Sequence, residues 1–356
     1  MVVDEQSNPG TLDTSSVVSV EEITINNNGF AATVLDANDI VGGTITINHT
    51  NGAASGDATI NNMGSTTSAV AGAGVDGVFT ADLSAGGGTI DGGSATDRLN
   101  VTLADGDGSP GVQGNSIERV FTRNVESNTP NAISLASFSG VEQTWNNNSL
   151  ADVTYEAVQS LSVIGVRDTD TSTTVEYDNS VLSGSDDTVT IVLDGAEENS
   201  EVTVQSTGSN GVEAIEVNST GENENTLSEL ADDTNDAETL TITGDQDVTI
   251  DAISNDFEVI DATAATGDVA IDASAAFTAN DVTFTGGDGD DTISVTTVDN
   301  DDEIDGGDGD DTLSVEGDFD GVNLENVETV EITEDNATVV IDAENAQSVS
   351  EFAVDA

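Results

Sequence analysis

The chain has 356 residues, including 70 Asp and Glu, four Arg, no Lys and no Cys, and its formal net charge is −66. This composition excludes disulfides and thiolate metal sites, and it leaves no basic patch that could meet the phosphates of nucleic acid or of an anionic membrane. Because self-repulsion on this scale opposes a compact state, bound cations or high external salt must neutralise part of the charge.

Residues 1–75 look different from the rest of the chain. Candidate strands at 17–20, 21–25 and 44–47 are separated by loops rich in Asn and Gly. We expect a separate N-terminal β-region here, with a small sandwich as one arrangement and a role in assembly or anchoring. The N-terminus lacks the features of a secretory signal peptide, so we expect that a leader was removed or that export uses another route. No apolar run reaches the ~18–20 residues that membrane insertion requires.

Residues 76–285 repeat a unit of short strands and turns about every 20 residues. One phrase, aliphatic-Thr-aliphatic-Asp-Ala and its close variants, begins at Val248 and Val269 and again at Val339 in the terminal coil 323–356, and a second short strand precedes each copy. Such a coil has too few apolar residues to fold alone, so stacking must build the core. We therefore expect an all-β solenoid with a thin core of Val, Ile, Leu and Ala. Helical patterns are almost absent, and the acidic stretch 221–238 is either one helical turn or an exposed loop.

A degenerate copy of a calcium-type turn lies at residues 91–101, which align without gaps onto residues 305–315. This segment keeps the Gly pair, Asp97 at the sixth position and the aliphatic Leu99, but it lacks the fourth-position Gly. Cation binding and an ordinary turn both remain open for it.

Residues 286–322 contain two intact copies of the nonapeptide G-G-x-G-x-D-x-U-x, in which U is a large aliphatic residue. The copies span 286–294 and 306–314. Glycines permit a tight turn whose carbonyls face one point, the sixth-position Asp adds a carboxylate, and the aliphatic residue enters the core of a parallel β-roll. Because carbonyl and carboxylate oxygens are the ligands that Ca²⁺ prefers, the sequence predicts calcium as the cofactor.

Two looser copies extend the predicted roll. Residues 298–305 carry Asn300 at the fourth position, where Asn suits a left-handed turn, and residues 317–322 carry Asp320 at the sixth. Alternate turns of a roll stack on the same side, so we expect Asp291 above Asp311 and Asp302 above Asp320, with a cation shared within each pair. The predicted metal-site residues are Gly286, Gly287, Asp288, Gly289, Asp290, Asp291, Asp299, Asn300, Asp302, Gly306, Gly307, Asp308, Gly309, Asp310, Asp311 and Asp320.

The two nonapeptides resemble RTX-type calcium-binding proteins. The long Thr-, Val-, Ala- and Asp-rich solenoid is similar to the bacterial surface-layer (S-layer) proteins of this group, which are exported by type I secretion. The resemblance implies an extracellular protein that folds on meeting external calcium and then self-associates on the cell surface. It also implies an uncleaved C-terminal secretion signal, for which the terminal coil at residues 323–356 is the candidate.

Three classes of function remain open. A structural protein that self-assembles into a layer, filament or matrix is favoured, and an RTX adhesin or matrix-binding module with a cell-surface polysaccharide as partner is the alternative. A β-helix enzyme acting on polysaccharide is disfavoured, because His49 is the only His and just four arginines could neutralise a substrate carboxylate. We therefore expect a homo-oligomer without catalytic activity. The four arginines are Arg98, Arg119, Arg123 and Arg167.

Overall fold

The computed structural model describes residues 96–103, 112–125, 131–317, 319–320, 322–333, 339–340 and 346–354, together with nine strands within residues 2–91. For those nine strands, and for residues 102, 112, 320, 339–340 and 354, it describes the backbone alone. The chain forms two compact units, residues 1–162 with 176–178, and residues 163–175 with 179–356. The strand β17 (Thr173–Tyr177) includes residues of both units.

Strands of the first unit are ordered in sheets whose described pairings are all parallel. One sheet has the order β1 (Val2–Glu5), β3 (Glu22–Asn27), β5 (Thr44–His49), β7 (Thr67–Val70), β9 (Gly88–Asp91) and β11 (Val112–Asn115). A second has the order β2 (Thr11–Leu12), β4 (Thr33–Asp36), β6 (Ala58–Asn61), β8 (Gly77–Asp82), β10 (Arg98–Leu103), β12 (Arg119–Asn124) and β14 (Gln143–Asn147). β13 (Asn131–Ser134) pairs with β15 (Val153–Val158).

The N-terminal strands alternate between two sheets, as the strands of a solenoid do. Ile23 lies opposite Ile45 and Ile25 opposite Ile47, so strands that are neighbours in a sheet are one coil apart in sequence. This parallel pairing differs from the small sandwich considered for residues 1–75, because a sandwich is built from antiparallel sheets. The domain limits at residues 75, 285 and 322 stay predictions.

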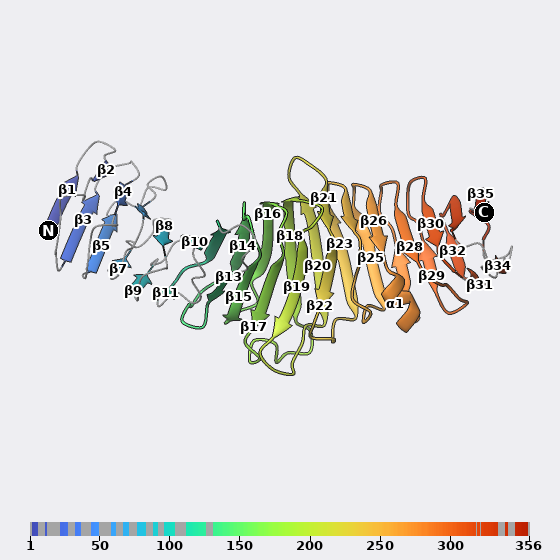
Figure 1. The fold of residues 1–356 in the computed structure, drawn as a ribbon, viewed down its shortest axis with the longest axis horizontal. Helices are drawn as coiled ribbons and strands as arrows, with labels where there is room; N and C mark the ends of the chain where they lie inside the picture. Colours follow the sequence, from blue (N-terminus) through green and yellow to red (C-terminus); the bar gives the residue numbers. More distant parts are fainter. Residues whose placement is uncertain are drawn as a thin grey trace. The chain divides into compact units, whose positions relative to one another are not determined.

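The second unit is a parallel β-solenoid in which successive strands alternate between two long sheets (Figure 1). One sheet contains β16 (Val163–Thr169), β18 (Thr188–Ala196), β20 (Ala214–Thr220), β23 (Thr239–Gly244), β25 (Val259–Ala265), β27 (Thr283–Thr285), β29 (Glu303–Asp305) and β32 (Asn323–Glu325). The other contains β21 (Asn225–Leu227), β24 (Val248–Ile250), β26 (Val269–Asp272), β28 (Thr292–Val295), β30 (Thr312–Val315), β33 (Thr329–Ile332) and β35 (Glu351–Val354). Two shorter ladders join β19 (Glu201–Ser206) to β22 (Glu229–Asp232) and β31 (Phe319–Asp320) to β34 (Val339–Val340).

The core of this solenoid is a pair of apolar, mainly aliphatic columns, one from each long sheet. In the first sheet the register aligns six buried side chains from successive coils, and none is more than 3% exposed. They are Ile215, Leu240, Ile260, Phe284, Ile304 and Leu324. The facing sheet aligns Ile250, Ile271, Ile293, Leu313 and Val330. Stacking between coils therefore builds the core, and the predicted solenoid is confirmed.

One short helix interrupts the coils. α1 (Ser274–Ala279) follows β26 and buries Ala276 and Phe277, although its N-cap residue Ala273 makes no side-chain capping bond. Packing of the apolar face therefore holds this single turn in place. No helix in the described part of the chain has the length and apolar character needed to span a membrane.

Candidate metal centre in the stacked turns

The sixth-position aspartates of the two nonapeptides lie one above the other. Thr292 of β28 is opposite Thr312 of β30, which brings the preceding residues Asp291 and Asp311 into register. The backbone N–H of Asp291 donates to Oδ1 of Asp311 at 2.7 Å, and each residue is 2% exposed. The expected stacking of this pair is confirmed.

The two carboxylates differ in how completely their oxygens are bonded. Asp291 accepts the N–H of Val269 at 2.8 Å on Oδ1 and that of Gly287 at 2.7 Å on Oδ2. Oδ2 of Asp311 is buried and, among the described residues, has no hydrogen-bond partner. A buried polar atom without a partner costs free energy, so this oxygen is a candidate ligand for a cation.

Burial without a counter-charge perturbs these acids. Burial raises the pKa of Asp291 and, at the neighbouring turn, that of Asp302. Burial, with further contributions from the charges of Asp291 and Glu328, raises the pKa of Asp311 to about 7, against the lowering effect of its backbone hydrogen bond. No Arg or Lys follows residue 167 in the sequence. A proton or a bound cation must therefore supply the positive charge at this site.

Close stacking of the turns explains the glycines at the first two nonapeptide positions. A Cβ on Gly286 would lie 1.9 Å from the carbonyl oxygen of Gly306. Gly307 has φ +96°, and its Cβ would lie 2.4 Å from the carbonyl oxygen of Gly287. Only a residue without a side chain permits this approach, which directs backbone carbonyls at the adjacent turn.

The fourth-position glycines obey the same constraint. Gly309 has φ +150°, and a Cβ there would lie 2.2 Å from the carbonyl oxygen of Gly289. Gly289 is itself buried beneath Asp268, whose Oδ1 would be 2.7 Å from an added Cβ. The nonapeptide spacing therefore corresponds to three points of backbone contact between coils.

The remaining acids of the nonapeptides form an exposed ladder. Asp288 and Asp308 are exposed. Asp310 donates its N–H to Oδ1 of Asp290 at 3.0 Å, and Asp290 donates to Oδ1 of Asp268 at 2.9 Å. These carboxylates line the outside of the turns, next to the buried pair.

Sequence reasoning missed three acids that belong to the same columns. Asp268 donates its N–H to Oδ1 of Asp247 at 2.9 Å, and Asp311 donates to Oε2 of Glu328 at 2.9 Å. Asp247, Asp268 and Glu328 each immediately precede a strand, as Asp291 and Asp311 do. An acid directly before a strand, in a coil near a nonapeptide, was the feature of the sequence that could have identified these three residues.

The second predicted pair does not stack. Glu303 lies opposite Asn323, so Asp302 is in register with Val322 and not with Asp320. The cause is a two-residue offset: Asp320 belongs to β31, which pairs with β34, and β32 begins only at Asn323. The side chain of Asp320 lies outside the described part of the chain. The carboxylate of Asp302 instead accepts the N–H groups of Val282 at 3.0 Å and Asp299 at 2.9 Å.

Asn300 does not adopt the left-handed conformation that its fourth-position place suggested. Oδ1 of Asp299 accepts the N–H of Asp301 at 2.9 Å, and Asp302 donates its N–H to the carbonyl of Asp299 at 3.3 Å. An Asx-type turn of this kind closes with negative φ throughout. The left-handed Asn lies in the next coil, at Asn326, with φ 50°.

The degenerate calcium-type turn at residues 91–101, in the first compact unit, shows part of the same arrangement. Asp97 is fully buried and donates its backbone N–H to Oε2 of Glu118 at 2.7 Å, as Asp311 does to Glu328. Its glycines at 92 and 93 lie outside the described residues. Cation binding there stays a prediction.

The donor chemistry of the nonapeptide turns suits a hard cation. Within the described ranges, no three side chains of His, Cys, Asp or Glu gather as a ready metal site. An ion in these turns would therefore rely on backbone carbonyls, with the Asp291 and Asp311 column adding carboxylate oxygens. Such an all-oxygen set fits Ca²⁺ and excludes metals that need nitrogen or sulfur ligands.

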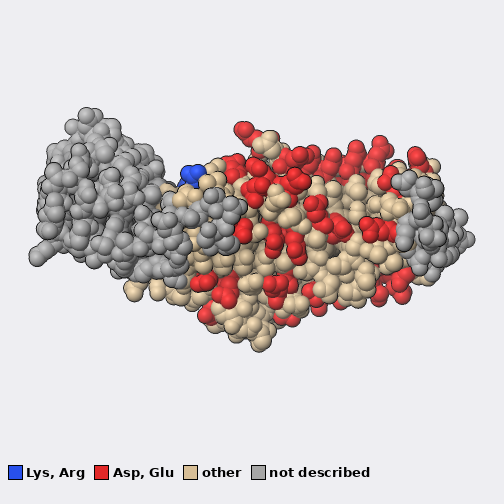
Figure 2. All heavy atoms as spheres, in the orientation of Figure 1, with Lys and Arg blue, Asp and Glu red and all other residues tan. Residues whose placement is uncertain are grey.

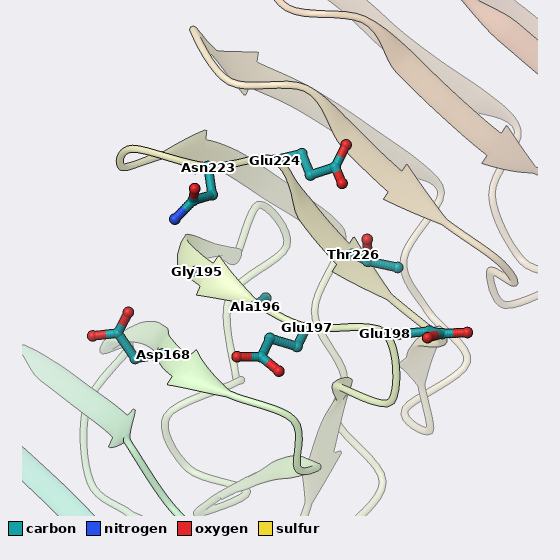
Figure 3. A pocket seen from close by; sticks show the side chains of 8 residues that line it. All are labelled: Asp168, Gly195, Ala196, Glu197, Glu198, Asn223, Glu224 and Thr226. Carbon is teal, nitrogen blue, oxygen red and sulfur yellow. The ribbon is translucent and has the colours of Figure 1, made fainter.

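A separate acidic hollow of about 490 Å³ lies in the second unit, lined by Asp168, Glu197, Glu198 and Glu224. Figure 3 shows these carboxylates around its rim, without a common point toward which all four are directed. The hollow therefore offers neither a converging metal site nor a paired-carboxylate catalytic site.

Comparisons of the chain with protein-family models, curated proteins and solved structures found no match.

Proposed function

We propose that this protein is a secreted, calcium-dependent structural protein that self-assembles into a cell-surface layer or an extracellular filament. In this proposal Ca²⁺ binds the turns at residues 286–311 and neutralises acids that the chain itself does not pair. The protein then acts through its surface and not through catalysis.

One observation carries the calcium part of the proposal. The buried Oδ2 of Asp311 has no hydrogen-bond partner among the described residues, and it lies beside glycine turns that bring backbone carbonyls together. A cation would satisfy this oxygen, and its charge would oppose the effect of burial, which is the main cause of the raised pKa of Asp311.

The structural role is supported by the architecture and the charge together. A solenoid presents long repetitive surfaces, and its acidic coils repel one another unless divalent cations or opposite charges intervene. An adhesin or matrix-binding module is the second candidate, since the same solenoid could hold a cell-surface polysaccharide.

Calcium titration followed by electron microscopy tests the proposal. We expect isothermal titration calorimetry to detect stoichiometric Ca²⁺ binding that Mg²⁺ does not reproduce, since Mg²⁺ demands a tighter octahedral site. Calcium-loaded protein should form ordered sheets or fibres, and chelated protein should not. Calcium-bound monomers at all concentrations would favour the adhesin instead, and the absence of calcium binding would contradict both.

A further inference from the structure

The few cations of this chain are concentrated in one region. Residues 1–162 hold nineteen Asp and Glu with three arginines, whereas residues 163–356 hold fifty-one with one. That single arginine, Arg167, is paired with Asp194 at 2.7 Å. The other three, Arg98, Arg119 and Arg123, all belong to the adjacent strands β10 and β12.

These arginines share the outward face of one sheet. Along β12, Val120 and Thr122 are fully buried, while Arg119 and Arg123 are exposed. Arg98 lies directly opposite Arg119 in the parallel register. Neighbouring strands are about 4.8 Å apart, so two like charges stand side by side. Like charges in this position destabilise a sheet. The pairing is notable in a chain with 70 Asp and Glu and only four Arg, because an acid at either position would remove the repulsion.

An aromatic stack holds the first arginine in position. The guanidinium of Arg98 lies 3.6 Å from the ring centre of Phe121, and Phe121 stacks on Trp145 with 5.4 Å between centroids and 2° between planes. The Nε of Arg123 donates to the carbonyl of Asn148 at 2.9 Å, so this guanidinium is oriented as well. The face is therefore a preorganised arrangement of positive charge.

The exposed groups select a carboxylate as the ligand. Phe121 and Trp145 are each only 7% exposed, so they offer no ring face on which a sugar could stack. The accessible groups are the guanidinium forks of Arg119 and Arg123, which match carboxylates in bidentate geometry. Among the described residues neither is within ion-pair distance of an acid.

We propose that the outward face of β10 and β12 binds the acidic surface of residues 163–356 of a second copy of this chain. Charge complementarity identifies this partner, since, on the face that Figure 2 shows, Asp and Glu are spread over the described residues while Arg occupies one small area. The inference rests on the proposed self-assembly and supplies one of its contacts. Each copy would then carry both the arginine face and the acidic surface that receives it. Two different surfaces of this kind give a head-to-tail contact, which can propagate an open array.

Matched charge removals test the contact. Arg119→Gln and Arg123→Gln each delete one exposed cation of the face, and Arg167→Gln makes the same change in net charge within residues 163–356, on the receiving side of the contact. In calcium, sedimentation equilibrium should show association weakened roughly tenfold by each of the first two variants, the size of one charge-assisted contact. Arg167→Gln should not weaken association, because it leaves the receiving surface more acidic, and Arg119→Lys should retain part of the affinity. Circular dichroism confirms that each variant is folded.

The position of the partner surface is testable because the chain has no Cys. A photo-crosslinker on Glu142→Cys, an exposed position beside the partner residue of Arg119 in β14, reports what lies against the face. Mixed isotopically heavy and light copies identify intermolecular products. We expect crosslinks to residues 163–356 of the other copy, and products confined to residues 1–162 would overturn the inference.

The outcomes separate this inference from the proposed function. Equal association of Arg119→Gln, Arg123→Gln and Arg167→Gln would overturn the arginine contact and leave calcium-dependent assembly standing. A wild-type protein that stays monomeric in calcium would overturn both. Retention on an immobilised uronic-acid polymer that both face variants lose, with self-association unchanged, would overturn the inference in favour of an acidic polysaccharide.

Discussion

Asp311 and Asp291 occupy the same position of two stacked nonapeptides, but their carboxylates have different partners. Both oxygens of Asp291 accept backbone N–H groups, whereas Oδ2 of Asp311 accepts none among the described residues. Asp291 therefore contributes to the fold in the absence of an ion, and Asp311 is the residue whose environment a bound ion would complete.

Replacing Asp311 should remove most of the stabilisation that calcium provides. At a calcium concentration of ~100 times the dissociation constant, one ion stabilises the fold by about 2.7 kcal/mol. We expect Asp311→Asn to lose most of that gain, measured as the calcium-dependent change in the free energy of unfolding by urea denaturation.

Asp288→Asn is the matched control, because it removes the same charge from an exposed position. It should change stability by less than about 0.5 kcal/mol. Equal losses in both variants would show that bulk charge controls the response.

The calcium-free protein should become more stable on mild acidification. The pKa of Asp311 is raised to about 7 by burial, whereas an unfolded Asp has a pKa of ~3.9. Between these values the folded state binds more protons than the unfolded state, so stability rises as the pH falls and is lost as the pH rises through the folded pKa. We expect the midpoint temperature of thermal unfolding, measured in chelator, to be higher at about pH 5 than at about pH 8.

Asp311→Asn provides the control for this pH dependence, since the rest of the acidic surface is unchanged. Its thermal midpoint should rise less over the same window than that of the wild type. Identical pH profiles for the two proteins would assign the effect to overall charge and contradict a site at Asp311.

At the scale of the element, the turns require glycine for two separable reasons. Gly307 has φ +96° and also lies against the carbonyl of Gly287, whereas Gly140 has φ +85° and an added Cβ would meet nothing closer than 3.4 Å. Both positions carry the conformational constraint, and only Gly307 carries the stacking contact as well.

Alanine substitutions should distinguish these two constraints. Gly140→Ala is expected to cost about 1–2 kcal/mol of stability through its backbone conformation, with calcium affinity unchanged. Gly307→Ala should cost more and lower calcium affinity at least roughly tenfold, because the turn must move away from the adjacent coil. Calorimetric titration of both variants measures the difference. Unchanged affinity in Gly307→Ala would place the ion outside these turns.

Sequence periodicity predicted the strands well but not their ends. The strands expected at 21–25 and 44–47 continue to Asn27 and His49 in β3 and β5, because Asn26 and Asn27 extend the parallel register with Asn48 and His49. The acidic stretch 221–238 contains the strands β21 and β22, with Leu227 and Leu230 fully buried. Their aliphatic residues are too few to show a period, so stacking against neighbouring coils decides the structure.

The candidate site was predictable only where the motif was intact. Two complete nonapeptides fixed the register of Asp291 and Asp311, since equal spacing puts equal positions in line. The Asp302 and Asp320 pairing was wrong because a loosely matching turn does not reveal an inserted strand such as β31. The helix α1 was missed because a single turn has no amphipathic period, although its Ala-rich sequence favours a helix.

At the scale of the whole molecule, the proposed calcium binding would couple the charge of the chain to its fold. The acids fall mainly on residues 163–356, where only one arginine is available. A solenoid places these acids in columns along stacked coils, so neighbouring carboxylates repel unless cations lie among them. Non-specific screening and bound calcium would both reduce this repulsion, but only bound calcium would act at defined turns.

Chelation at low ionic strength should therefore unfold at least residues 286–322. Unscreened charges repel over ~30 Å at 0.01 M salt and ~10 Å at 0.1 M, so low salt exposes the full repulsion. We expect hydrogen exchange followed by mass spectrometry to show rapid exchange of the amides of β28 and β30 in chelator, and slow exchange when calcium is restored.

Sodium chloride is the control for screening: at equal ionic strength it should protect these strands less than calcium does. The strands β10 and β12 carry three arginines and should change less. Unchanged protection of β28 and β30 after chelation in low salt would show that the solenoid holds these turns without an ion.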